Sequence, residues 1–223
     1  MTQPRITPEE LTSALFVDYE GNMQRDPTLL GWRVDGITHG AIVDPDFAPC
    51  ADRWRAKKIF LHSHRALLRE LIIQVSDERR VVIGWSEHDL KLMQAVLPPK
   101  EQDRLTLLYR NAVKTARSWH ARHENRRAPT GELAYFCQLL GFPVPQAYGA
   151  GRVGQALRLI RGQLLEGRDY PDLTRRARAS WAVVVKHNAL DLQAMEFVLH
   201  AMLGVTLHKR QPAQMALTLV QSD

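Results

Sequence analysis

The chain has 223 residues, of which 45% are hydrophobic and 24% charged, the composition of a globular protein that buries a core. Thirty Lys and Arg residues outnumber 24 Asp and Glu residues, and the net charge of +6 favours a polyanionic partner without requiring one. The first residues lack the apolar core of a signal peptide, no apolar run reaches the ~18 residues of a membrane helix, and the two cysteines lie far apart. These features argue against a membrane protein and a disulfide-rich secreted domain, and we expect a cytoplasmic protein.

The first part of the chain predicts an antiparallel meander of three strands. Apolar runs at residues 14–18, 29–34 and 37–43 have the length of strands, and turn residues separate them. Asp35-Gly36, between the second and third runs, is a strong signal for a two-residue hairpin. We therefore expect these three strands to start one sheet, each paired with the next.

Helices and parallel strands are predicted to follow the meander. Helical spacing of apolar residues predicts one helix over residues 53–76, and the β-branched run 81–85 predicts a buried strand parallel to the first. A helix capped by Ser86 then ends before Pro98-Pro99, and residues 105–109 form a candidate fifth strand. Helices are also expected at residues 133–140, 153–165 and 174–203. This order predicts an α/β fold with a mixed sheet flanked by helices, in a single domain.

Two carboxylates, Asp18 and Glu20, end the first predicted strand with one residue between them. Alternate side chains of a strand point to the same face, so both carboxylates should project together from its C-terminal end. Like charges held side by side repel each other, and a divalent cation with oxygen ligands relieves that repulsion. The alternative is a strand that simply runs into a polar turn formed by residues 20–22.

Two further acids lie where the predicted fold brings distant segments together. Asp89 follows the buried strand 81–85, and parallel strands end at the edge of the sheet where ligands usually bind. Asp191 lies midway along the long apolar helix, and His187, four positions earlier, shares its helix face. The ordinary alternatives are a charge in the first turn of a helix for Asp89 and a packed or solvated histidine for His187.

The segment from residue 110 to residue 127 is strongly basic and contains aromatic side chains. One interpretation is a surface whose cations contact phosphates and whose rings stack on bases. The other is the solvated face of a helix. The residues predicted to contact nucleic acid in the first interpretation are Arg110, Lys114, Arg117, Trp119 and Arg122.

Four segments together resemble the RNase H-like superfamily of DEDD-type 3′-5′ exonucleases, and more narrowly its YprB-like branch of predicted nucleases. They read LFVDYEGN, VVIGWSEHDLKLM, LAYFCQLLGF and VVVKHNALDLQAMEFVL, and they lie within residues 14 to 203. The family has an Asp-x-Glu motif on strand one, an Asp after strand four, and an Asp on the last helix with a Tyr or His upstream. Each motif is short, and their common order makes the resemblance more specific than any one of them.

The resemblance implies an RNase H-like fold and a two-metal site. Four carboxylates would hold two Mg²⁺ or Mn²⁺ ions, and His187 would stand at the position of the general base. The implied activity is 3′-5′ exonucleolytic hydrolysis of phosphodiester bonds at single-stranded DNA or RNA ends. The implied metal ligands are Asp18, Glu20, Asp89 and Asp191.

The chain departs from the family pattern in two motifs. His187 precedes Asp191 by the interval typical of the tyrosine-type motif, although it is a histidine. Residues 85–89 read Trp-Ser-Glu-His-Asp and lack the asparagine common in this branch, so Glu87 or His88 is a candidate replacement. Two other functions stay open: a catalytically silent nuclease-like domain that binds nucleic acid or a protein, and a metal-dependent phosphoesterase for small substrates.

Overall fold

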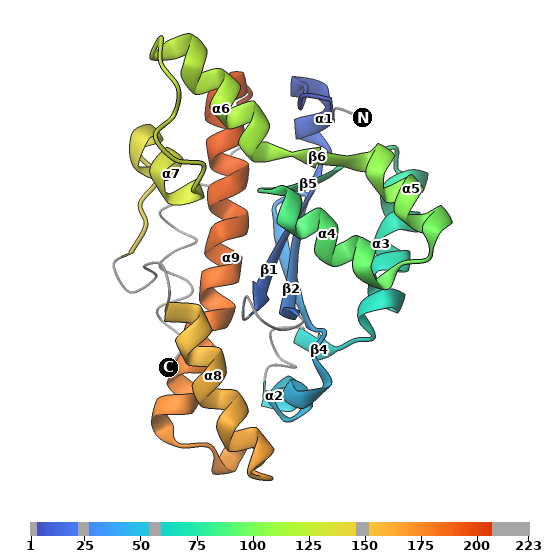
Figure 1. Cartoon of the computed structure of the whole chain (residues 1–223), viewed down its shortest axis with the longest axis vertical. Coiled ribbons are helices and arrows are strands. Elements are labelled where there is room, and N and C mark those ends of the chain that lie inside the picture. The colour runs from blue at the N-terminus through green and yellow to red at the C-terminus, as the bar shows by residue number, and fades with distance from the viewer. Residues whose placement is uncertain (1–3, 22–26, 54–58, 146–151, 207–223) are drawn as a thin grey trace.

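Six strands form one mixed sheet in the computed structural model, which describes residues 4–21, 27–53, 59–145 and 152–206 (Figure 1). The spatial order is β4-β3-β2-β1-β5-β6. The first three strands pair antiparallel, while β5 lies parallel to β1 and β6 parallel to β5. The predicted mixed α/β sheet is thus confirmed, with bounds β1 Leu15–Gly21, β2 Pro27–Val34, β3 Ile37–Ile42, β4 Ile59–Leu61, β5 Val82–Gly84 and β6 Tyr109–Asn111.

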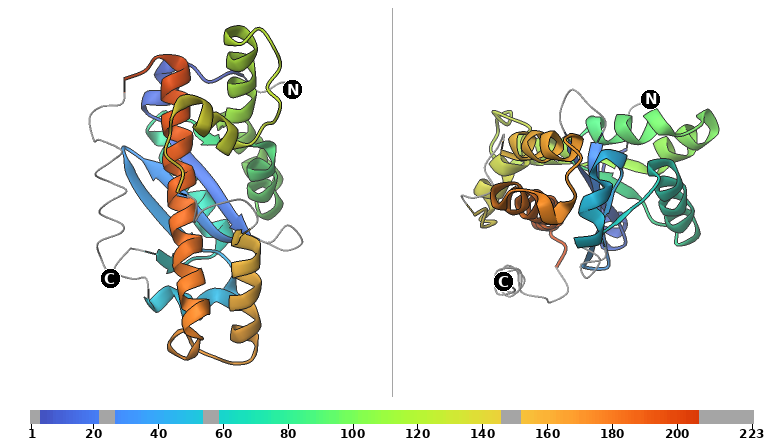
Figure 2. Two further views of the ribbon diagram at one scale, coloured as in Figure 1. Left: turned by 90° about the vertical axis from the view of Figure 1, so that its left-hand side faces the viewer. Right: turned by 90° about the horizontal axis from the view of Figure 1, so that it is seen from below.

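Helices cover both faces of this sheet, as Figure 2 shows in its view from below. In the described ranges, no helix is long and apolar enough to cross a membrane. Short 3₁₀ turns occupy Pro45–Phe47 and Tyr170–Asp172. The helices are α1 Pro8–Thr12, α2 Ala48–Arg53, α3 His64–Asp77, α4 Glu87–Val96, α5 Pro99–Leu108, α6 Ala112–His123, α7 Leu133–Leu140, α8 Arg152–Leu165 and α9 Arg175–Leu203.

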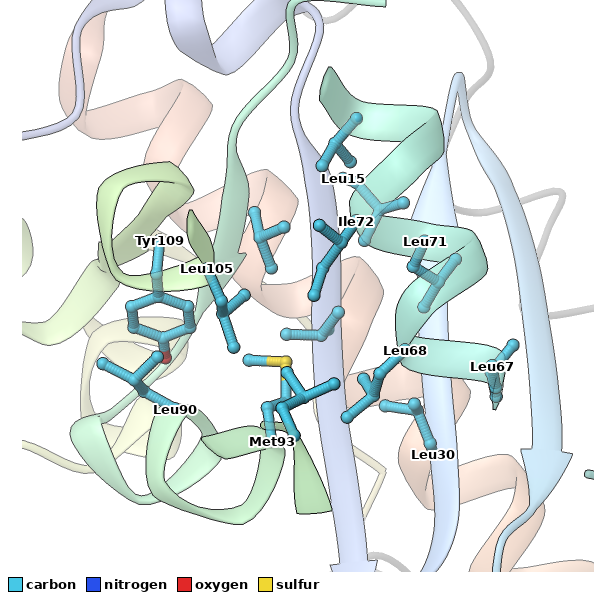
Figure 3. Packing of buried hydrophobic residues seen from close by; sticks show 14 of the residues in the cluster. Leu15, Leu30, Leu67, Leu68, Leu71, Ile72, Leu90, Met93, Leu105 and Tyr109 are labelled. Atoms are coloured by element: carbon cyan, nitrogen blue, oxygen red, sulfur yellow. The ribbon is translucent and has the colours of Figure 1, made fainter. Parts of the chain in front are cut away.

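On one face, α3, α4 and α5 pack on the centre of the sheet (Figure 3). Leu15 and Val17 of β1 contribute to this core because they alternate with the residues that face the other way. Leu68 of α3 and Met93 of α4 pack in the same buried cluster. The odd-numbered residues of β1 therefore face α3 and α4.

The opposite face is covered by α8 and by the 29-residue helix α9 (Figure 2). Phe16 of β1 lies in a buried cluster with Leu192 and Met195 of α9. A nearly buried ion pair, with 2.7 Å between Arg33 Nε and Glu196 Oε2, also joins β2 to this helix. The even-numbered residues of β1, which include Asp18 and Glu20, therefore face α9.

The predicted hairpin between β2 and β3 is confirmed. Asp35 and Gly36 both have positive φ angles, 50° and 76°, as a type I′ turn requires. Val34 pairs with Ile37 directly across the turn. The short turn fixes the register of β2 on β3, in which Gly31 lies opposite Gly40.

The prediction of a single helix over residues 53–76 was wrong. Helix α2 ends at Arg53, β4 occupies Ile59–Leu61, and α3 begins only at His64, while residues 54–58 lie outside the described ranges. Strand β4 forms because it pairs in parallel with β3, where Gly40 lies opposite Ile59. Such pairing between distant segments overrides a local helical pattern.

The fifth strand was also misplaced. Residues 105–108 belong to α5, which starts with Pro99 in its first turn, and the strand occupies Tyr109–Asn111. Leu105 packs from α5 into the core on the α3 side (Figure 3). A short apolar run does not distinguish a buried helical turn from a strand, and here the helix continues to Leu108.

Strand β2 and helix α9 approach closely at Gly31, which gives a stability test. A Cβ atom at Gly31 would lie 1.8 Å from Asn188 Oδ1 and 2.9 Å from Leu192 Cδ1. We expect Gly31→Ala to lower the free energy of unfolding by about 1–3 kcal/mol, because the helix must shift. Urea denaturation of the two proteins measures this difference.

Gly162 supplies the matched control, since it lies exposed in α8 and a Cβ there meets no atom within 4 Å. Gly162→Ala should raise the free energy of unfolding by about 0.5–1 kcal/mol through helix propensity. Equal stability of Gly31→Ala and the parent protein would contradict the close packing of α9 on β2.

Candidate metal centre

Strand β1 lies in the middle of the sheet and carries two of the predicted ligands toward α9. Asp18 and Glu20 have the same parity as Phe16, which packs on this helix. The Glu20 carboxylate is almost buried, and β5 runs parallel to β1 on the side away from β2. The prediction that the two carboxylates share one face of the strand is therefore confirmed by their common orientation.

Helix α9 brings His187 and Asp191 to the Glu20 carboxylate. His187 Nδ1 lies 2.8 Å from Glu20 Oε1 and 3.3 Å from Asp191 Oδ2. One ligand atom from each of these three residues lies within 4.8 Å of the others, a spacing that suits a shared metal ion. One turn of α9 thus supplies both partners, because residues four apart share a helix face.

Asn188 and Gly31 belong to this site, although the sequence analysis missed both. Asn188 Nδ2 donates hydrogen bonds to Asp18 Oδ2 at 2.8 Å and to the Asp18 carbonyl oxygen at 3.1 Å. Gly31 leaves the space that the Asn188 side chain occupies. A glycine inside a predicted strand is a signal for such a close approach, whereas the role of Asn188 needs the orientation of α9.

Asp89 serves as an N-terminal residue of α4 and also lies near the other acids. Its Oδ2 accepts a hydrogen bond of 2.9 Å from the Ser86 backbone N–H, which completes a capping box. Its side chain is nearly buried, and its charge contributes to raising the pKa of Asp18. The two interpretations of Asp89, as a cap residue and as a neighbour of the acidic site, are compatible.

Glu87 and His88, the candidate replacements in the second motif, contact neither Asp18 nor Glu20 in the described structure, although the charge of His88 lowers the pKa of Asp89. Both are exposed in the first turn of α4. Glu87 Oε1 lies 2.5 Å from Lys114 Nζ of α6. The described contacts therefore give neither residue a place beside Asp18 or Glu20.

Burial and mutual repulsion raise the pKa values of the clustered acids. For Asp18, burial is the largest cause, and the charges of Glu20, Asp191 and Asp89 raise its pKa further, while the Asn188 hydrogen bond lowers it. Burial also raises the pKa of Glu20, against the stabilising effect of His187 on its ionised form. The pKa of Asp191 rises to about 7, chiefly through burial. His187 lowers the pKa values of Glu20 and Asp191, but its effect is smaller than that of burial.

The set of donors fits a divalent cation. Carboxylate oxygens are the ligands that Mg²⁺ prefers, and Mn²⁺ accepts both carboxylate and imidazole ligands. A cation among these groups would offset the repulsion that now raises the pKa of Asp18. The residues whose ligand atoms lie close enough to share one ion are Glu20, His187 and Asp191. Asp18 and Asp89 lie outside that group, within electrostatic range of it.

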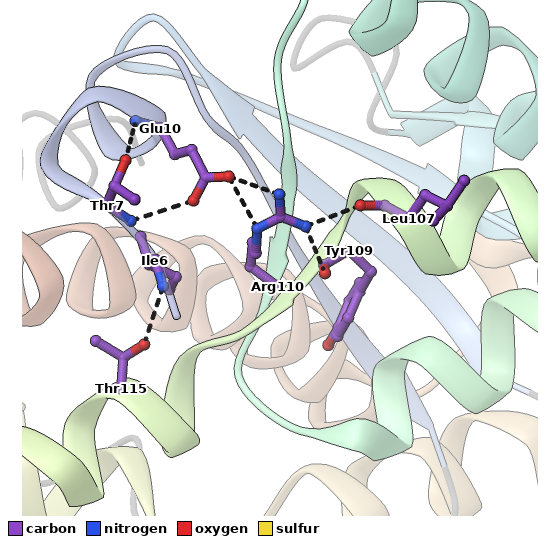
Figure 4. Close-up of polar contacts among 7 residues, drawn as sticks. All are labelled: Ile6, Thr7, Glu10, Leu107, Tyr109, Arg110 and Thr115. Carbon is purple, nitrogen blue, oxygen red and sulfur yellow. Dashed lines mark hydrogen bonds and ion pairs between the residues drawn. The ribbon is translucent and has the colours of Figure 1, made fainter. Parts of the chain in front are cut away.

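Arg110, predicted to contact nucleic acid, is instead bonded within the protein (Figure 4). Its Nε and Nη2 donate to Glu10 Oε1 at 2.9 and 2.6 Å. Its Nη1 donates to the carbonyl oxygens of Leu107 and Tyr109 at 2.8 and 3.1 Å. This guanidinium joins α1 to β6, and its charge is paired with Glu10 within the protein.

The other predicted contact residues lie on α6. Arg117 and Arg122 are exposed there, and Lys114 is half-exposed beside Glu87. The Trp119 ring stacks on the His123 ring with centroids 4.4 Å apart and an interplanar angle of 21°. The helix therefore presents cations on its surface, beside an aromatic pair whose Trp119 ring is partly buried against the core cluster that contains Phe136 and Val198. Nucleic-acid binding there stays a prediction.

The raised pKa of Asp191 predicts how pH affects the stability of the metal-free protein. Between its ordinary value of 3.8 and about 7, the folded chain binds this proton more tightly than the unfolded chain. The contribution of Asp191 to stability is therefore present at low pH and is lost as pH rises through that window. With EDTA present, we expect Asp191→Asn to reduce the fall in Tm between pH 4 and pH 7. An identical pH dependence in parent and variant would contradict a buried, crowded carboxyl group.

No protein-family model, curated protein or solved structure matches this chain. Its function therefore has to be inferred from the arrangement of the residues themselves.

Proposed function

We propose that this protein is a metal-dependent nuclease with an RNase H-like fold that hydrolyses single-stranded DNA or RNA ends in the 3′-5′ direction. The observation that carries the proposal is the meeting of Asp18 and Glu20 on β1 with His187 and Asp191 on α9. These segments are separated by about 170 residues, and they are the first and last of the resembling motifs. The order of the sheet, a meander followed by parallel strands on the other side of β1, supports the same proposal.

The carboxylates of Asp18, Glu20, Asp89 and Asp191 would hold the ions. When bound, two Mg²⁺ or Mn²⁺ ions supply a Lewis acid for the phosphate and lower the pKa of the attacking water. The acidic side chains come from β1, α4 and α9, so the sheet and two helices together fix their spacing. This arrangement keeps the negative charges close before any substrate binds, which is the condition for holding dications.

His187 would accept the proton from the attacking water. If the Glu20 carboxylate accepts the N–H of His187 Nδ1, the opposite ring nitrogen is left as the basic one. The contact between His187 Nδ1 and Asp191 holds the ring in the same orientation. A histidine could therefore act as the general base four residues before Asp191, the position at which the tyrosine-type motif has its tyrosine.

Single-stranded substrate would extend from this site along α6. Arg117 and Arg122 offer charge to the phosphates, and the ring pair of Trp119 and His123 offers a surface on which bases stack. A phosphoesterase acting on small phosphates would need the carboxylates but not this surface. We also expect a cytoplasmic location, from the two separated cysteines.

Loss of the acidic ligands should abolish activity. We expect Asp18→Ala/Glu20→Ala and Asp191→Asn each to reduce Mn²⁺-dependent release of mononucleotides from a labelled single strand by at least about 100-fold, because they remove groups that bind the ions. Asp103→Asn, at an exposed acid on α5, is the control and should keep the parent rate.

Degradation at the parent rate by folded Asp18→Ala/Glu20→Ala protein would overturn the proposed catalytic site. Comparison of single-stranded DNA, RNA and a chromogenic phosphodiester distinguishes the substrate classes. Hydrolysis of the small diester alone would identify a phosphoesterase. Binding of a strand without hydrolysis in Mg²⁺ or Mn²⁺ would identify a silent nuclease-like domain.

The surface of α6 gives an independent prediction. Arg117→Glu/Arg122→Glu should weaken single-strand binding and reduce the slope of log affinity against log salt by about 1.4, or roughly 0.7 for each lost phosphate contact. Fluorescence anisotropy at several salt concentrations measures this slope. Lys100→Glu/Arg104→Glu makes the same charge change at exposed positions of α5 and should leave the slope near that of the parent. Equal slopes for all three proteins would assign α6 to plain solvated surface.

A further inference from the structure

Asn188 is a buried amide whose hydrogen bonds go to a single acidic residue. It lies on α9 between His187 and Asp191, and only 2% of it is exposed. Its Nδ2 donates to both the carboxylate and the backbone carbonyl of Asp18. The two N–H bonds of an amide group suffice for two such contacts, so the amide nitrogen has both of its hydrogens directed at β1.

Gly31 of β2 defines the space in which this amide lies. It pairs with Asp18 across the β1–β2 ladder. A Cβ atom at Gly31 would approach Asn188 Oδ1 to 1.8 Å and Asn188 Cγ to 2.7 Å. The oxygen side of the amide therefore lies over β2, while its nitrogen reaches β1. Two adjacent strands thus determine the orientation of one side chain of α9.

An amide suits this place better than a charged group. Asp18 has three other carboxylates near enough to affect its ionisation, so an additional acid at position 188 would add to the repulsion. A lysine would bring a fixed positive charge that competes with a cation. The neutral N–H donors stabilise the ionised carboxylate and occupy only its Oδ2 atom. The second carboxylate oxygen receives no hydrogen bond from this amide, and in the proposed site it would be the oxygen that faces the cation.

We propose that Asn188 is the positioning residue for Asp18, holding its carboxylate in the orientation in which it binds a divalent cation. Gly31 contributes to this positioning, because a glycine at this point of β2 leaves room for the Asn188 amide beside β1 and β2. This inference rests on the proposed metal-dependent function, and it assigns to Asn188 no contact with substrate. It also explains how a single turn of α9 orients both acids of β1. His187 contacts Glu20, and Asn188 contacts Asp18.

Mn²⁺ affinity of the folded protein tests this role without relying on activity. Asn188→Leu removes both donors and keeps a side chain of similar size. We expect its dissociation constant for Mn²⁺, measured by calorimetry and by the electron paramagnetic resonance signal of free Mn²⁺, to rise about 10- to 100-fold. Asn188→Ala removes the same donors and gives the second measurement if the branched side chain prevents folding. Gln193→Leu, at a part-exposed position of the same helix, is the control and should keep the parent affinity.

Gly31→Ala acts from β2 and should push the Asn188 amide away from Asp18 of β1. It removes no hydrogen-bonding group from the chain. Positioning predicts that this variant also binds Mn²⁺ more weakly once folded. A merely structural role predicts lower Tm values but unchanged Mn²⁺ affinity in the folded Asn188 and Gly31 variants, and that result would overturn the inference alone. Absence of Mn²⁺ binding by the parent protein would overturn the proposed function and this inference with it.

Discussion

The close contact of α9 with β1 and β2 is the constraint on which the site depends. Gly31 lets the helix approach the strands, and Asn188 fills the space that this glycine leaves. Leu192 and Met195 then pack beside Phe16, which holds the next turns of the helix on the sheet. The packing of α9 on β1 and β2 therefore also determines the position of the turn that carries His187, Asn188 and Asp191.

The packing of α9 on β1 brings several carboxylates together, and the protein groups around them offset little of their negative charge. Asp18 and Glu20 belong to a central strand, so they cannot turn away into solvent as acids in a surface loop can. The contacts of His187 and Asn188 stabilise their ionised forms, yet the net effect still raises the pKa values of both acids. Such an arrangement costs stability in the metal-free protein, and binding of a cation would offset that cost. Function and stability are thus coupled through the same few carboxylates.

The sequence predicted the meander and the long last helix, because these depend on local patterns: apolar runs, the Asp35-Gly36 turn and helical spacing. Only the family resemblance implied that acids of β1 and α9 meet, since no local pattern links segments so far apart in the chain. The sequence did not predict β4 or the true position of β6, since short strands form by pairing with distant partners. Asn188 and Gly31 were missed because their roles depend on how one helix lies across two strands. Arg110 has the charge of a phosphate ligand, yet its contact with Glu10, 100 positions away, cannot be seen in the local sequence.

The central claim is that Asp18, Glu20, Asp89 and Asp191 bind divalent cations. Anomalous diffraction from a crystal soaked in Mn²⁺ tests it most directly, since it locates the ions independently of any activity. We predict two Mn²⁺ peaks among these four carboxylates, at coordination distance from their oxygens. Density maps that show the four side chains as ordered, with no anomalous peak among them at saturating Mn²⁺, would contradict the claim.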